Sequence, residues 1–453
     1  MKKIPCSLLI FIILLTACTT ETTLVTPTLA PVTPTRIPAT ATLAISAISS
    51  PTLALPTFSF NSTPFATPTS VGNDPFSVVA RIDEIFPDSE WVDIQSAQNG
   101  TVWLLTDQGI ARMSDAGWTI YLSGYEGYLI GIDSMDQAWV ISETRDSISV
   151  WDGTMWTKYS GENGWEALKS PEDLGMAVAP GQYIWMASLD ELPGQIWLST
   201  REDVRRFDGV RWKIFKLEEM GLTQGTKDPN FDPFPLPLIG VEAIQSTGEV
   251  WVGECDSWPN SLPFDGSGAR WFDGKSWRGK STPVESGCVH SIQEDAAGNI
   301  WMAVNFSLWR FTPSTQAWAN FTLTEFSAHS QSFIFDIAIS DAGEPWLITQ
   351  ALCPGGGACT SRTLYHLEEG VWRPVGSITN VSINLGAVLS DSAGTIWLLP
   401  SQGESGFYRI VDNIPQLVSN LIVNDWTMDT TGRIWVIGKA GQEDKESLWL
   451  ATE

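Results

Sequence analysis

Aromatic and acidic side chains recur in long polar segments in the middle of the chain. The aromatic members are Trp165 and Trp258, and the acidic members are Asp173, Asp228, Asp232, Asp256 and Asp265. Planar rings stack on the apolar faces of sugars or on cations, and carboxylates accept hydrogen bonds from hydroxyl and ammonium groups. The set predicts a site for a carbohydrate or a peptide. For any single member, loop packing or a solvated charge is the alternative reading.

Histidine is the other residue type that could do chemistry. Of the three His in the chain, His290 stands at the start of a predicted strand and His329 just before the next one, with Glu285 close in sequence. So few His disfavour a His-rich metal site, and a structural His290 is the commoner outcome. No nucleophile elbow, phosphate-cradling loop or metalloprotease helix is present. We therefore assign no catalytic residue, no metal and no cofactor, count His290 with the binding set, and leave enzyme activity open.

Four cysteines lie beyond the N-terminal region, and an even number in an exported chain favours disulfides. The predicted pairs are Cys255 with Cys288 and Cys353 with Cys359, because each pair is local to one group of loops. Four unpaired thiols are the alternative. A metal site built from all four is less favoured, since no Cys-x-x-Cys spacing occurs.

The N-terminus has the features of an export signal. Lys2 and Lys3 precede an apolar run, 7–17, that is too short to span a bilayer and ends at Leu15-Thr16-Ala17-Cys18. This sequence resembles the lipobox of bacterial lipoproteins, which implies removal of 1–17 and lipid attached to Cys18. The expected partner is then a lipid bilayer, with the protein in the cell envelope, outside the cytoplasmic membrane, in the periplasm or at the cell surface. An ordinary cleaved signal peptide is the alternative.

Residues 18–75 form a Thr-rich and Pro-rich tract in which only Glu21, Arg36 and Asp74 are charged. Such a composition cannot bury enough apolar surface to offset chain entropy, so we predict a disordered linker that acts as a spacer. The whole chain carries a net charge of −26. That charge disfavours nucleic acid as a partner, because phosphate binding relies on clustered Lys and Arg.

Residues 76–453 contain a repeat in which a turn is followed by an apolar residue and Trp. Its eight copies end at Trp103, Trp139, Trp197, Trp251, Trp301, Trp346, Trp397 and Trp435. Most copies carry a second element downstream, an aromatic residue followed by Asp-Gly and a Trp, as in Phe272-Asp273-Gly274 before Trp277. These two positions hold most of the 23 Trp. The Trp content is therefore mainly architectural.

Each repeat divides into four short strands, a to d, joined by tight turns. In the fifth repeat we expect strands over 289–294, 300–304, 307–311 and 318–322. A period of about 47 residues predicts an all-β, eight-bladed propeller, with seven blades as the alternative. The last repeat lacks strand d, and the apolar stretch 77–86 is predicted to supply it and close the ring. The seventh repeat has Ile414-Pro415 where the hairpin Trp is expected, so its outer strand is in doubt.

The Gly-x-Ile-Trp turn and the Phe-Asp-Gly-x-x-Trp hairpin resemble the two-component regulator propeller repeat of bacterial sensors. The chain departs from those sensors because it has no histidine kinase or DNA-binding segment. The resemblance implies an extracellular domain that binds a ligand or a protein partner. A weaker resemblance to the virginiamycin B lyase group implies a metal-dependent lyase with His290 at the channel mouth, as an alternative. A structural or adhesive scaffold is a third possibility.

The order of strands predicts which face binds. The a-to-b and c-to-d turns share one face, and the b-to-c and d-to-a connections share the other, which we call the loop-rich face. The long segments 160–182, 218–240, 254–268, 279–288 and 351–362 all belong to the second group. Long loops on a rigid scaffold commonly carry binding sites, although tolerated insertions are the alternative.

Overall fold

The structure is a computed structural model. It describes residues 75–451, with gaps at 88, 90–91, 98, 107, 115–116, 122–126, 169–184, 189–194, 201–202, 223–237, 256–267, 323–331, 341, 353–357, 376–384, 392, 401–404, 430 and 442–445. The predicted signal segment 1–17, Cys18 and nearly all of the predicted linker lie outside the described residues. None of the helices in the described part of the chain has the length and apolar character needed to cross a membrane.

The described residues form an all-β structure in which the first six repeats are four-stranded antiparallel sheets. The strands are β2 (Val92–Ser96), β3 (Val102–Thr106), β4 (Gly109–Ser114) and β5 (Gly117–Tyr121); β6 (Gly127–Ile132), β7 (Ala138–Ser142), β8 (Ile148–Trp151) and β9 (Trp156–Tyr159); β10 (Trp185–Ser188), β11 (Ile196–Ser199), β12 (Asp203–Phe207) and β13 (Trp212–Lys216). They continue as β14 (Leu238–Ile244), β15 (Glu249–Cys255), β16 (Gly268–Phe272) and β17 (Trp277–Arg278); β18 (Val289–Glu294), β19 (Ile300–Val304), β20 (Ser307–Thr312) and β21 (Ala317–Thr322); β22 (Ser332–Ile339), β23 (Pro345–Leu352), β24 (Ala358–Glu368) and β25 (Val371–Pro374).

The last two repeats share one seven-stranded sheet, in the order β1-β31-β30-β29-β28-β27-β26. Its strands are β26 (Leu385–Ser390), β27 (Ile396–Pro400), β28 (Ser405–Val411), β29 (Ile414–Met428), β30 (Ile434–Ala440), β31 (Ser447–Ala451) and β1 (Phe76–Arg81). The first half of β29 pairs with β28 and the second half pairs with β30. The described residues therefore form seven hydrogen-bonded sheets. They still contain eight four-stranded units, because the last two units share β29 and count as one sheet.

The seventh repeat keeps its outer strand, so the doubt raised by Ile414-Pro415 was wrong. Pro415 lies in β29 opposite Ile410, and Ile414 lies opposite Val411. The ladder tolerates Pro here because a proline that has no neighbour on its N–H side removes no hydrogen bond. The loss of the hairpin Trp therefore did not remove the strand.

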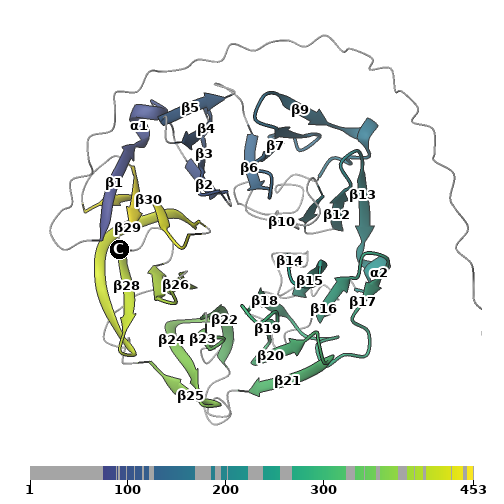
Figure 1. Ribbon diagram of the computed structural model, residues 1–453, viewed down its shortest axis with the longest axis vertical. Coiled ribbons are helices and arrows are strands. Elements are labelled where there is room, and N and C mark those ends of the chain that lie inside the picture. Colours follow the sequence, from purple (N-terminus) through teal and green to yellow (C-terminus); the bar gives the residue numbers. More distant parts are fainter. Residues whose placement is uncertain are drawn as a thin grey trace, which may run out of the picture. The chain divides into compact units, whose positions relative to one another are not determined.

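The units follow one another around a ring (Figure 1). Contacts between innermost strands run in sequence from β2 through β6, β10, β14, β18 and β22 to β26, and β29 contacts β2. The ring closes as predicted, because β1 pairs antiparallel with β31, from Phe76 opposite Ala451 to Arg81 opposite Ser447. The predicted strand is shorter than 77–86, since Ile82–Ile85 forms the short helix α1.

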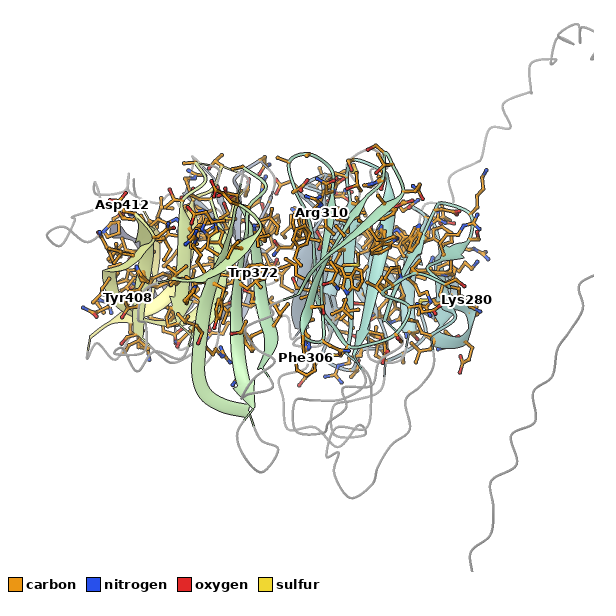
Figure 2. All side chains as sticks on the ribbon, turned by 90° about the horizontal axis from the view of Figure 1, so that it is seen from below. Lys280, Phe306, Arg310, Trp372, Tyr408 and Asp412 are labelled. Atoms are coloured by element: carbon orange, nitrogen blue, oxygen red, sulfur yellow. The ribbon has the colours of Figure 1, made fainter. Side chains whose placement is uncertain are left out.

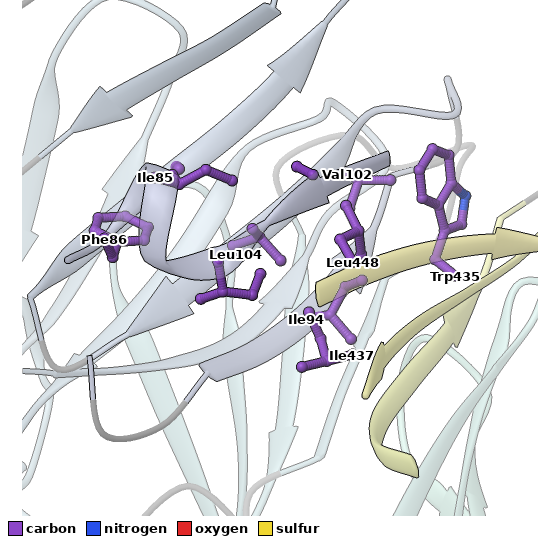
Figure 3. Close-up of a cluster of buried hydrophobic side chains, with 11 residues drawn as sticks. Ile85, Phe86, Ile94, Val102, Leu104, Trp435, Ile437 and Leu448 are labelled. Carbon is purple, nitrogen blue, oxygen red and sulfur yellow. The ribbon is translucent and has the colours of Figure 1, made fainter. Parts of the chain in front are cut away.

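Apolar residues fill the seams between neighbouring units, and the closure seam illustrates the pattern (Figure 3). Ile94 and Leu104 of the first repeat pack against Ile437 and Leu448 of the last. Phe86, in the connection that follows α1, completes the same cluster. The d-to-a connection thus contributes to the core before it reaches the next unit.

The repeated turn is held by its aspartate. Asp295 Oδ1 accepts hydrogen bonds from the amides of Ala297 and Asn299. Its other oxygen accepts a 2.8 Å hydrogen bond from the indole N–H of Trp301, a contact that the sequence did not reveal. The same pairing joins Asp133 to Trp139, Asp391 to Trp397 and Asp429 to Trp435. One carboxylate therefore closes the turn and fixes the buried Trp.

Candidate functional site

Most of the predicted loop site lies outside the described residues. This applies to Asp173, Asp228, Asp232, Asp256, Trp258 and Asp265, to Cys353, to His329, and to the side chains of Cys255 and Cys359. The described residues confirm the meander order that puts these loops on one face. In Figure 2, Phe306 in a b-to-c turn and Asp412 in a c-to-d turn lie at opposite faces of the ring. Binding by the loop residues stays a prediction.

Trp165 is buried, so the prediction of an exposed aromatic contact was wrong for this residue. Its side chain is 2% exposed and packs edge-on against Trp212 at 5.1 Å. The Arg205 guanidinium lies 4.6 Å from its ring centre, and its indole N–H donates to the carbonyl of Arg145. Trp165 fills the seam between the second and third units.

Trp165 is one of several apolar residues that stand at the start of d-to-a connections and fill the seam between two neighbouring units. We call these residues seam plugs. Met220, at the end of the short helix α2 (Leu217–Met220), fills the next seam, and Val284 fills the one after it. Phe86 does the same at ring closure. The long segments on the loop-rich face are therefore anchored in the core where they begin.

His290 lies on β18, and its ring nitrogen Nε2 is 3.3 Å from the sulfur of Cys288. Burial lowers the pKa of His290 to about 4, so the imidazole is neutral at neutral pH. Cys288 is disulfide-bonded, and a disulfide sulfur can only accept a hydrogen bond. The pairing of Cys288 with Cys255 stays a prediction, because the Cys255 side chain lies outside the described residues.

Half-buried titratable groups gather on the innermost strands, and only one of them, His290, was singled out from the sequence. Asp93 on β2, Glu242 on β14, Asp336 on β22 and Asp425 on β29 join His290 on β18 as the inner-strand set. Burial shifts the pKa of each toward its neutral form. The pKa of Glu242 rises to about 8, with the Glu294 carboxylate adding to the effect, and that of Asp336 rises to about 7.

Two members of the set link neighbouring units. Asp336 accepts hydrogen bonds from the amides of Ile337 on its own strand and Val388 on the next innermost strand, each at 2.9 Å. Asp425 makes the equivalent bonds to the amides of Trp426 and Ile94 across the closure seam. These bonds to the charged forms oppose the burial effect on the pKa values. Both residues therefore have a structural role.

Asp93 and Asp425 share a hydrogen bond at the closure seam. Two carboxyl groups at hydrogen-bond distance hold one proton between them, because two charges that close repel. The pKa of Asp93 is raised well above its usual value, mainly by burial and next by the Asp425 charge. Asp93 is thus the protonated partner, and Asp425 accepts its hydrogen bond.

Carboxylates on the perimeter behave in the opposite way. Asp152, Asp208 and Asp273 of the c-to-d hairpins each accept two backbone amide hydrogen bonds near the surface. Their pKa values are lowered, to about 2 for Asp273, whose largest cause is the amide of Ser276. The hairpin carboxylates therefore favour their charged forms, in contrast to the acidic groups of the innermost strands.

One sequence signal could have found part of the set. Asp93, Asp336 and Asp425 each stand ten residues before the Trp of the following strand, at Trp103, Trp346 and Trp435. Glu242 lacks that spacing but lies opposite its own Trp, Trp251. A carboxyl group inside an otherwise apolar strand is unusual, because burying a charge is costly. Among the described residues, no three His, Cys, Asp or Glu side chains form a cluster that could hold a metal ion.

No protein-family model and no curated protein matches the chain. Solved structures with a similar fold include virginiamycin B lyase from Staphylococcus aureus, at 13% identity and a TM-score of 0.39, with 72% of this chain and 94% of that chain covered. A streptogramin B lyase matches at 13% identity and a TM-score of 0.40, over 83% and 97% of the two chains. The extracellular domain of a protein assigned as a hybrid two-component system from B. thetaiotaomicron matches at 13% and 0.32, over 79% and 58%.

Proposed function

We propose that this protein is a lipid-anchored β-propeller of the cell envelope that binds an extracellular ligand, a carbohydrate or a peptide, at a site that includes the innermost strands of its ring. The anchor follows from the Cys18 sequence match alone. Cell-surface or periplasmic placement, with a bilayer as partner, belongs to the same proposal.

The inner-strand set is the observation that supports binding. A propeller needs apolar seams, yet Glu242 lies on an innermost strand with a carboxyl group whose ionisation is opposed by burial. No backbone or side-chain hydrogen bond contributes to its pKa, in contrast to Asp336 and Asp425. A strained titratable group without an evident structural task is typical of a functional site. Glu242 is therefore the member of the inner-strand set whose substitution best distinguishes a role in binding from a role in folding.

The test replaces Glu242 by an apolar residue of similar length. A glycan and peptide array probed with wild type identifies ligands, and Glu242→Met is then compared with it by titration. We expect at least a tenfold loss of affinity together with unchanged or increased melting temperature, because replacing a desolvated carboxyl group by an apolar side chain relieves its desolvation cost.

Glu369→Met is the matched control, because Glu369 is exposed and lies in a c-to-d hairpin, on the face opposite the loop-rich face. It should retain full affinity. Equal affinity of Glu242→Met and wild type for every array ligand would show that Glu242 is not part of the binding site. A large loss of stability in Glu242→Met would assign the residue a structural role instead.

A further inference from the structure

The face that carries the a-to-b and c-to-d turns, which we call the turn face, exposes large apolar side chains. In the part of the chain that the structure describes, six such side chains are exposed: Met135, Met155, Val210, Val371, Ile414 and Leu417. Met135 lies in the a-to-b turn of the second repeat, and the next four lie within or beside c-to-d hairpins. Leu417 lies further along β29 than Ile414. Apolar hairpin tips are therefore a recurring feature of the turn face.

The four hairpin tips belong to two pairs of neighbouring repeats on opposite sides of the ring. Met155 and Val210 belong to the second and third repeats, and Val371 and Ile414 belong to the sixth and seventh. In Figure 1 the strands β9 and β13 lie across the ring from β25 and β28. Val210 is 66% exposed and Ile414 is 58% exposed. A small ligand cannot touch both sides of the ring at once, whereas a flat surface can contact all four tips.

The described chain enters the ring at the same face. Strand β1 begins at Phe76, which pairs with Ala451 at the end of β31, and this end of the unit is the one that carries the c-to-d turns. The predicted linker, 18–75, therefore joins the propeller on the turn face. A disordered chain of that length spans about 40 Å, so a lipid anchor at Cys18 keeps this face at a high local concentration near the bilayer. The tether by itself leaves the orientation of the ring open.

The charges of the turn face select the kind of bilayer. The amides of Arg211 and Val210 lower the pKa of Asp208, so this carboxylate is charged at neutral pH beside an apolar tip. Asp273, in the hairpin of the fourth repeat, is charged for the same reason, with its pKa lowered to about 2. Together with the net charge of −26, these carboxylates repel anionic headgroups. A zwitterionic lipid surface does not impose this repulsion.

We propose that the turn face docks on the surface of a zwitterionic bilayer, with the apolar hairpin tips of the second, third, sixth and seventh repeats inserted among the headgroups. Burial of apolar side chains at the interface is favourable, and the backbone and charged groups of the hairpins stay hydrated there. The loop-rich face then points away from the membrane. The inference rests on the lipid anchor of the proposed function and adds the orientation that the tether does not fix.

The experiment places the lipidated full-length protein in phosphatidylcholine vesicles that contain a doxyl-labelled quencher lipid. A bimane fluorophore is attached either to Lys275→Cys in a c-to-d hairpin or to Glu162→Cys in a d-to-a connection, and both positions are exposed. Wild type treated with the same dye corrects for labelling of the native cysteines. We expect at least twofold stronger quenching at 275 than at 162. Replacing part of the phosphatidylcholine by phosphatidylglycerol should reduce that difference, because the turn face is acidic.

Variants assign the docking to the apolar tips. Val210→Asp combined with Ile414→Asp, one on each side of the ring and both away from the label, should abolish the difference in quenching between 275 and 162. Ser314→Asp combined with Gln316→Asp is the matched control, because it adds the same two charges to a hairpin that exposes no large apolar side chain. This control should quench as the parent protein does.

Three outcomes would overturn the proposal. Equal quenching at 275 and 162 in protein that sediments with the vesicles would refute docking and leave the anchor in place. A blue-shifted emission at 275 without quenching would show that a protein, such as a second copy of this chain, covers the turn face instead of lipid. Failure of the protein to sediment with the vesicles would refute the anchor of the proposed function together with this inference.

Discussion

At the scale of single residues, acidic side chains have different tasks at different places in the propeller. Asp295 and its equivalents hold a turn and an indole between strands a and b, while Asp93 and Glu242 lie on innermost strands, where burial raises their pKa values. Among aromatics, the hydrogen-bonded indoles of strand b and the seam plug Trp165 are both structural. Residue type alone therefore does not identify the binding residues of this chain.

Trp165→Ala tests the corrected role of Trp165. A fully packed Trp replaced by Ala costs about 3 to 5 kcal/mol of folding free energy, because apolar contacts are lost and a cavity remains. Val210→Ala is the control, since Val210 is 66% exposed, and it should change stability by less than about 0.5 kcal/mol. Urea unfolding of the two variants measures both values. Equal stability of Trp165→Ala and wild type would show that Trp165 is not packed in the seam.

Glu242 should make folding stability fall as pH rises. Its folded pKa of about 8 lies above that of an unfolded Glu, so the folded state binds more protons between about pH 5 and pH 8. The stabilising contribution is complete below the unfolded pKa and is lost as pH rises through the folded value, by a few kcal/mol. Glu242→Gln should flatten the unfolding free energy over this range, whereas Glu162→Gln should keep the wild-type slope. A wild-type slope in Glu242→Gln would refute the assignment.

At the scale of elements, short connections contribute to the packing between units as the strands do. Phe86 after α1, Trp165, and Met220 of α2 each seal a seam between units. Strand β29 joins two units within one sheet, and β1 supplies the last strand of the ring from the other end of the described chain. The long d-to-a segments of the loop-rich face therefore begin at residues that are packed in the core.

Removing β1 and α1 should open the ring. A chain that begins at residue 87 lacks the partner of β31 and four buried apolar residues of the closure cluster, Ala80, Ile82, Ile85 and Phe86. We expect a loss of several kcal/mol, because a ladder and its apolar contacts disappear together. A chain that begins at residue 75 also lacks residues 1–74 but keeps β1 and α1, and it should melt as the full-length protein does. Identical melting of the two truncated chains would show that β1 does not close the ring.

The strands were predictable because the repeat shows them eight times. In the fifth repeat the predicted strands agree with β18 to β21 to within one residue at each end. Helix α1 was missed because 82–85 is as apolar at its ends as a strand, with Asp83 and Glu84 suited to a first helical turn. Trp165 was misplaced because a Trp in a polar segment looks the same in sequence whether it plugs a seam or faces solvent. The inner-strand acids were missed because their burial depends on the ring, and only the ten-residue spacing to the following Trp marks three of them in the sequence.

At the scale of the whole molecule, the proposal joins an anchor, a spacer and a propeller. Cys18→Ala should release the protein from membranes, because lipid attachment at this residue is what the Leu-x-Ala-Cys match implies. A carbonate wash of membranes followed by immunoblotting measures the retained fraction, with Cys6→Ala as the matched control that stays bound. Retention of the Cys18→Ala variant would contradict the anchor and leave the propeller unaffected.

The central claim is that ligand binds at the innermost strands of the ring. Hydrogen–deuterium exchange of the full-length protein, with and without a ligand taken from the array, tests it most directly because exchange reports on individual strands. We predict slower exchange in β14, β18 and β22, where Glu242, His290 and Asp336 lie, and no change in the outer strands β9, β13 and β21. Protection confined to the outer strands or to the c-to-d hairpins, with the innermost strands unchanged, would contradict the account.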